Sequence, residues 1–192
     1  HIDYTPAEID KDYLPNVEII SDLAAALYQL NKGLIDRLGE KKLPLFNIKS
    51  RKKLRDEMID DLEMNNYDDS FPMKPQRILS DVRKFMGDED ILISDVGAHK
   101  MWVAREYNCT KPNTCLISNG FCTMGFALPA SIGAKMAFPK KKILSINGDA
   151  GFLMNVQDLE TAVRYNINII VVVWLDGSYG LIKWKQQVHF DG

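Results

Sequence analysis

The chain has 192 residues, enough for one ordinary domain with a sizeable apolar core. Its 24 basic and 26 acidic residues nearly balance, which predicts no general attraction to nucleic acid or to an anionic membrane. The apolar run Ile167–Leu175 is far too short to cross a bilayer. Three cysteines, Cys109, Cys115 and Cys122, lack metal-ligand or redox spacing, which predicts reduced thiols and a cytoplasmic location.

Two segments precede the main domain. Residues 1–31 predict a strand remnant at the start, a short strand near Val17–Ile20 and a helix over 22–31 capped by Ser21. Because the chain opens without a Met and in the middle of an apparent strand, we expect it to be a piece of a longer polypeptide. Residues 32–70 are highly charged and predict a linker with one helix over 50–65.

From residue 71 the pattern alternates between helices and short apolar strands, which predicts an α/β domain over 71–192 with a parallel sheet flanked by helices. Pro75 begins the first helix. The expected strands are Ile91–Ser94, Cys115–Ser118, Lys142–Ile146 and a central strand Ile167–Leu175. The expected helices between them run through Ile132 and Met136, and from Asn155 to Tyr165.

Two acidic residues follow consecutive strands of this pattern. Asp149 lies at the tip of the turn that follows Ile146, and Asp176 follows Leu175. Right-handed crossovers bring both carboxylates to the carboxyl edge of the sheet, where Mg²⁺ and a diphosphate could bind. The N–H groups of Ala150 and Gly151 would hold phosphate oxygens. The alternative from the residues alone is a tight turn in which Asp149 merely caps a helix.

The spacing of these residues resembles the thiamine diphosphate motif. That motif opens with Gly-Asp-Gly and closes with Asn about 27 residues later, and Asp176 follows Asp149 by 27 positions. The resemblance implies that Asp149 and Asp176 are side-chain Mg²⁺ ligands, with the carbonyl of Ser178 as a third. Two residues depart from the motif, because Ala150 replaces Gly and Asp176 replaces Asn. Both substitutions resemble members of the acetolactate synthase family, and Asp keeps an oxygen donor.

Two further segments follow strands. A lone histidine such as His99 is more often structural than catalytic, and Met124 among apolar neighbours is typical of a core methionine. By resemblance, however, 96–102 (VGAHKMW) lies at the diphosphate end of the cofactor, with Ala98 where the family commonly has Gln, and 123–129 (TMGFALP) touches its aminopyrimidine ring. Met124 would then support the bent cofactor, and the carbonyl of Cys122 would accept a hydrogen bond from it. The implied cofactor-binding set is Gly97, Ala98, His99, Cys122, Met124, Gly148, Ala150, Gly151, Ser178 and Tyr179.

Within this superfamily the chain is most similar to acetolactate synthases, in segments 118–134 and 152–164. The resemblance implies decarboxylation of pyruvate and ligation to a second 2-oxo acid, giving 2-acetolactate. It also implies a homodimer or homotetramer whose active site is shared between subunits. The glutamate that activates the cofactor would lie on a domain outside this chain, so we expect the chain alone to be inactive. Bound FAD in the intact protein stays open.

Two alternatives remain. The first is another thiamine diphosphate-dependent decarboxylase or carboligase that acts on a different 2-oxo acid. The second is a non-catalytic module that binds a phosphate or a nucleotide.

Substrate choice rests on one departure from the family. Biosynthetic acetohydroxyacid synthases carry a Trp nine positions after the second metal ligand, where it favours 2-oxobutyrate. Here that position is Lys185, and Trp184 precedes it. In a helix, an offset of one residue turns a side chain by about 100°. The sequence therefore predicts little preference for 2-oxobutyrate.

Overall fold

The structure is a computed structural model that describes residues 1–9, 12–39, 48–64 and 66–190. Contacts between residues divide the chain into two compact units, His1–Arg55 and Asp56–Gly192. The domain boundaries predicted at residues 31 and 70 stay predictions. Within the described ranges no helix has the length and apolar character needed to cross a membrane.

The first unit contains a short parallel pair and one long helix. Strand β1 (Ile2–Asp3) pairs with β2 (Ile19–Ile20), and α1 (Leu23–Leu38) follows. The cap predicted at Ser21 is wrong, because Asp22 accepts a hydrogen bond from the N–H of Ala25 at 2.8 Å. The carboxylate of Asp22 is placed to satisfy a first-turn N–H group of this helix. Helix α2 (Ile48–Glu63) crosses the boundary between the units and confirms the helix predicted over 50–65.

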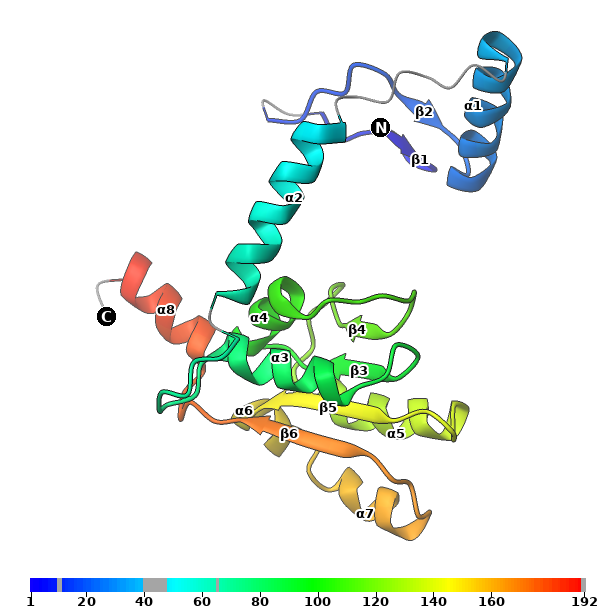
Figure 1. The fold of residues 1–192 in the computed structure, drawn as a ribbon. Coiled ribbons are helices and arrows are strands. Elements are labelled where there is room, and N and C mark those ends of the chain that lie inside the picture. Colours follow the sequence, from blue (N-terminus) through cyan, green and yellow to red (C-terminus); the bar gives the residue numbers. More distant parts are fainter. Residues whose placement is uncertain (10–11, 40–47, 65, 191–192) are drawn as a thin grey trace. The chain divides into compact units, whose positions relative to one another are not determined.

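The second unit is an α/β domain, as predicted (Figure 1). Four parallel strands lie in the order β4-β3-β5-β6. Their bounds are β3 Ile91–Ser94, β4 Cys115–Ile117, β5 Ile143–Gly148 and β6 Ile170–Trp174. The helices are α3 Pro75–Phe85, α4 Ala98–Glu106, α5 Ala127–Ala137, α6 Asp149–Met154, α7 Asp158–Arg164 and α8 Gly180–His189.

Helices cover both faces of β3 and β5, and two clusters of buried side chains fill the space. On one face Leu79 of α3 and Val103 of α4 pack against Leu92 and Ile146. On the other face Ala127 of α5 packs against Ile93 and its neighbours. Every residue of β3 is buried, because the strand is covered on both faces and paired on both edges.

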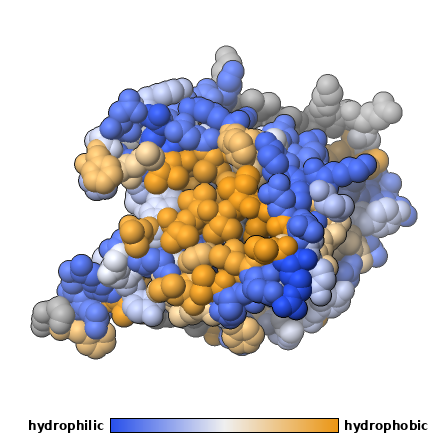
Figure 2. All heavy atoms as spheres, turned by 90° about the horizontal axis from the view of Figure 1, so that it is seen from below, coloured by the Kyte–Doolittle hydropathy of each residue, from blue (hydrophilic) through white to orange (hydrophobic). Residues whose placement is uncertain are grey.

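Strand β6 corrects one prediction. The run Ile167–Leu175 was expected to form a central strand, yet its strand Ile170–Trp174 is the outermost of the described strands and is only partly buried. Val173 is 41% exposed and Leu175 is 78% exposed. Figure 2, seen from the side on which β6 and α7 lie in Figure 1, shows apolar side chains gathered on this face. The apolar, β-branched run therefore forms the expected strand, but that strand is not buried between neighbouring strands and helices.

A second correction concerns the turn predicted after β5. The structure has a short helix there, α6, which spans Asp149–Met154 and is capped by Asn155. The side-chain amide of Asn155 donates to the carbonyl of Gly125 at 2.6 Å, a contact between residues 30 positions apart. The helix predicted over Asn155–Tyr165 is confirmed as α7, with the shorter bounds Asp158–Arg164.

The core predicts a clear contrast between two truncations. Ile146→Ala removes a fully buried side chain from the cluster around Leu92, and we expect it to lower the free energy of unfolding by about 2–4 kcal/mol. Val163→Ala is the control, because that side chain is 77% exposed, and it should change stability by about 0.5 kcal/mol or less. Denaturant unfolding measures both. Equal effects of the two substitutions would contradict the packing described here.

Candidate functional site

A cavity of about 280 Å³ lies at the carboxyl ends of β3, β5 and β6. The order of the strands explains why the cavity lies at this position. The chain passes from β3 to β4 on one side and later returns to β5 on the other, so the loops after β3 and β5 diverge and leave a space between them. The lining residues are Val96, Gly97, Ala98, His99, Trp102, Cys122, Met124, Gly148, Asp149, Ala150, Gly151, Trp174, Asp176, Ser178, Tyr179, Gly180, Leu181 and Ile182.

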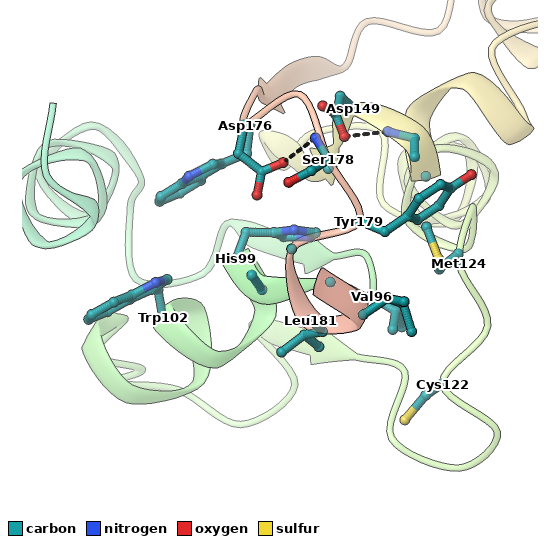
Figure 3. Close-up of a pocket in the computed structure, with 18 residues that line it drawn as sticks. Val96, His99, Trp102, Cys122, Met124, Asp149, Asp176, Ser178, Tyr179 and Leu181 are labelled. Atoms are coloured by element: carbon teal, nitrogen blue, oxygen red, sulfur yellow. Dashed lines mark hydrogen bonds between the residues drawn. The ribbon is translucent and has the colours of Figure 1, made fainter. Parts of the chain in front are cut away.

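Every residue singled out from the sequence as a site residue lines this one cavity (Figure 3). The residues come from four separate segments of the chain, which the sheet brings together. Gly97 to His99 span the start of α4, Cys122 and Met124 precede α5, Gly148 to Gly151 span the end of β5 and the start of α6, and Ser178 and Tyr179 follow β6. This grouping does not by itself assign a role to any of them.

Asp149 and Asp176 lie on neighbouring strand ends and are linked through one loop. In the register of β5 and β6, Gly148 pairs with Trp174, so the two acids leave the sheet at nearly the same level. Asp149 accepts hydrogen bonds from the N–H groups of Ala150 at 2.7 Å and Gly177 at 2.9 Å. Asp176 accepts one from Ser178 at 3.1 Å (Figure 3). The N–H of Ala150, predicted to be free, is therefore occupied by the carboxylate beside it.

The two carboxylates form a pair and not a larger group. In the described part of the chain, no three His, Cys, Asp or Glu side chains come together as a metal-binding cluster. A cation here would take its remaining ligands from backbone carbonyls or from a bound anion, as Mg²⁺ often does. The second oxygen of Asp176, Oδ2, faces Gly180, where an added Cβ would come within 2.8 Å. Glycine at this position leaves room for that oxygen.

His99 is the other polar group of the cavity and is buried, with 4% of its surface exposed. Its ring stacks on Trp174 with the centroids 6.5 Å apart. Burial lowers the pKa of His99 below its ordinary value of 6.5, although the charge of Asp95 opposes this. The Nε2 atom is buried without a hydrogen-bond partner in the structure. A buried nitrogen without a partner is unfavourable, so it marks a place where a ligand atom would be stabilised.

Asp95 is a residue of this site that was not predicted from the sequence. It directly follows β3, and its side chain is fully buried beside the cavity. It accepts hydrogen bonds from three backbone N–H groups, those of Val96, Gly125 and Phe126. The rule that selected Asp149 and Asp176, an acid just after a parallel strand, would have selected Asp95 as well. No comparable signal marked Asn155 or Trp174.

Comparison with known proteins gives two findings. Residues 95–192, just over half of the chain, match the family described as "Thiamine pyrophosphate enzyme, C-terminal TPP binding domain". Nearly the whole chain is also similar to proteins named acetolactate synthase.

Three of these relatives come from different organisms. Identity is 33% to the catabolic acetolactate synthase of Raoultella terrigena, over 99% of this chain and 34% of the relative. It is 36% to the probable large subunit of Methanocaldococcus jannaschii, over 99% and 32%, and 35% to the large subunit of Lactococcus lactis, over 100% and 32%. The chain therefore spans about a third of the length of these curated relatives.

The buried histidine predicts a pH dependence of stability without ligand. Between the unfolded pKa of about 6.5 and the lower folded pKa, the unfolded chain binds one more proton than the folded chain. The free energy of unfolding should therefore fall as the pH drops through this window, by up to about 1.4 kcal/mol per pH unit. His99→Gln should show a smaller fall between pH 8 and pH 5 in denaturant unfolding. Parallel profiles for the two proteins would contradict the burial of a neutral His99.

Proposed function

Because this chain belongs to the thiamine pyrophosphate enzyme family through its C-terminal TPP binding domain, we propose that the cavity binds thiamine diphosphate with Mg²⁺ and that the intact protein is an acetolactate synthase. One observation carries the proposal. A pair of carboxylates on adjacent strand ends and a buried histidine nitrogen without a partner border the same cavity. A divalent cation and a diphosphate satisfy both features together.

The donor atoms suit Mg²⁺. Asp149 and Asp176 offer hard carboxylate oxygens, and the hydrogen bond from Gly177 to Asp149 fixes the loop that carries Asp176 and Ser178. We assign Asp149 and Asp176 as side-chain ligands and the carbonyl of Ser178 as a third. The replacement of the usual Asn by Asp176 adds a negative charge close to the cation. A bound metal would then stabilise two carboxylates that otherwise repel each other.

Other groups of the cavity could donate hydrogen bonds to the diphosphate. His99 presents the buried Nε2 atom, and helix α4 begins at Ala98, so its first-turn N–H groups border the same space. Because Ala98 stands where the family commonly has Gln, only the backbone of that residue can contribute a donor. The N–H of Ala150 is held by Asp149, so we assign phosphate contacts first to His99 and to the start of α4.

The apolar part of the cavity suits the cofactor rings. Met124, Leu181 and Ile182 line it, and a methionine fills irregular space without competing for hydrogen bonds. We assign Met124 as the side chain that supports the rings and the carbonyl of Cys122 as an acceptor. Bound thiamine diphosphate supplies a nucleophilic carbon and an electron sink for decarboxylation. The chain itself binds and orients the cofactor and keeps water from its reactive end.

The size of the cavity supports a shared active site. At about 280 Å³ it is slightly smaller than the range of roughly 300–1,000 Å³ for small-molecule sites. We propose that a partner subunit in a homodimer or homotetramer completes it and provides the activating glutamate. The substrates are pyruvate and a second 2-oxo acid. Another carboligase or decarboxylase of the same family is the alternative, and the names of the relatives favour acetolactate synthase.

The metal assignment predicts the effect of Asp149→Ala in the intact protein. Loss of a ligand should weaken Mg²⁺-dependent binding of thiamine diphosphate by at least about 100-fold, beyond what loss of a ligand's supporting group costs. Tryptophan fluorescence titration measures the affinity, and far-UV circular dichroism should stay unchanged. Asp158→Ala is the matched control, because Asp158 also begins a helix but does not line the cavity. Equal affinity of the Asp149 variant and the wild type would sink the assignment.

Substrate choice follows from the place of Trp184. The side chain is 55% exposed and lines an adjoining groove with Met101 and Trp102, but it does not itself line the cavity described above. Without an aromatic wall that recognises one extra methylene, roughly 1–3 kcal/mol of discrimination is missing. We therefore expect the intact enzyme to show little preference for 2-oxobutyrate over pyruvate as second substrate.

A competition assay with both 2-oxo acids tests this expectation. Lys185→Trp should introduce a preference for 2-oxobutyrate, and Trp184→Leu should leave the product ratio unchanged. A strong preference in the wild type that disappears in Trp184→Leu would mean that Trp184 already forms the pocket wall.

A further inference from the structure

We propose that Asp95 is a positioning residue, which acts with Asn155 to fix the backbone around Gly125 and thereby hold Met124 in the wall of the cavity. The effect of Asp95 on cofactor affinity rests on the proposed function. The pairing of backbone groups by Asp95 and Asn155 does not depend on that function.

Asp95 joins two of the loops that border the cavity. Its Oδ1 accepts from the N–H of Val96 at 2.8 Å, within the loop after β3, and from the N–H of Phe126 at 3.2 Å. Its Oδ2 accepts from the N–H of Gly125 at 3.0 Å. Gly125 and Phe126 lie at the amino end of α5, where backbone N–H groups lack partners within the helix. A buried anion there also interacts favourably with the helix dipole.

A third segment of the cavity wall, at Gly151, leaves space for the carboxylate of Asp95. A Cβ added to Gly151 would lie 2.4 Å from Oδ2 of Asp95, closer than two such atoms can approach. Gly151 belongs to α6, the helix after β5. The carboxylate of Asp95 therefore accepts from the segments after β3 and before α5 and lies against Gly151 in α6, so it joins three of the four segments that line the cavity.

Asn155 holds the other side of Gly125. Its side-chain amide donates to the carbonyl of Gly125 at 2.6 Å. The peptide between Gly125 and Phe126 thus has its carbonyl paired with Asn155 and its N–H paired with Asp95. Gly125 has φ +83°, and an added Cβ would lie 2.7 Å from the amide nitrogen of Asn155, so this geometry requires glycine. With both flanking peptides fixed, the preceding residue, Met124, has a defined direction.

The role depends on the two acceptor oxygens of Asp95 and not on the shape of its side chain. All three partners of Asp95 are N–H donors, and an ionised carboxylate has acceptor sites for all of them. The isosteric asparagine offers one acceptor oxygen and places an NH₂ group against the remaining donors. Asp95→Asn therefore keeps the volume but leaves at least one buried N–H group unpaired, and it should release the Gly125 segment.

Asp90 provides a matched control. It also accepts from two backbone N–H groups, those of Gly87 and Lys142, both at 2.8 Å. It precedes β3 at the opposite edge of the sheet and does not line the cavity. Asp90→Asn therefore tests the general cost of the same chemical change away from the site.

The experiment compares the two variants with the wild type in the intact protein. In the cofactor-free state, hydrogen exchange by mass spectrometry should show the amides of Gly125 and Phe126 exchanging at least about tenfold faster in Asp95→Asn but not in Asp90→Asn. In the presence of Mg²⁺, the Kd for thiamine diphosphate should rise at least about tenfold in Asp95→Asn and less than about twofold in Asp90→Asn. When Asn155→Ala and Asp95→Asn are combined, the loss of free energy of cofactor binding should be smaller than the sum of the two separate losses, because both substitutions act on one segment.

The two readouts separate the possible failures. Unchanged exchange at Gly125 and Phe126 in Asp95→Asn overturns the proposal. Faster exchange with an unchanged Kd overturns the link between this segment and the cofactor. If wild-type protein binds no thiamine diphosphate, the proposed function fails, and the exchange data still decide whether Asp95 fixes the segment. If Asp95→Asn does not fold, Asn155→Ala alone must show the faster exchange, and its absence overturns the proposal.

Discussion

Parallel pairing of β3, β5 and β6 is the constraint on which the site depends, because it places the ends of three strands at one edge of the sheet. Each of these ends is followed within two residues by an aspartate, Asp95, Asp149 or Asp176. The three carboxylates accept three, two and one backbone N–H groups respectively. A carboxylate whose acceptor sites are filled by the backbone organises the loops, and one with free oxygens can bind a cation.

Small residues make this crowded edge possible. Gly151 leaves room for Asp95, Gly180 leaves room for Asp176, and Gly125 leaves room for Asn155. In each case an added Cβ would lie closer than 3.0 Å to a polar side-chain atom, so the glycines are required by the polar groups around them and not only by the turns. His99 completes the arrangement, because its burial lowers its pKa and favours the neutral imidazole, and its buried Nε2 has no hydrogen-bond partner in the structure.

Much of the fold could be predicted because its signals are local. Four-residue apolar runs such as Ile91–Ser94, a proline at the start of α3 and helical spacing of apolar residues each depend on neighbours in sequence. The same signals could not show that β6 would be the outermost described strand, because an apolar composition does not distinguish a buried strand from a partly exposed one. They also left a turn where the short helix α6 follows β5, because six residues are too few to show helical spacing of apolar side chains.

The sequence by itself determined which residues follow each strand, and hence that Asp149 and Asp176 would lie at one sheet edge beside the glycine loops. It also determined the family, through the spacing of those residues. Only the tertiary structure decided how the acids differ. Asp95 lies among the amides of a loop 30 residues away, whereas Asp176 accepts from one backbone N–H group and its Oδ2 lies beside Gly180. Hydrogen-bond partners that are distant in sequence cause that difference, and neither composition nor periodicity predicts such partners.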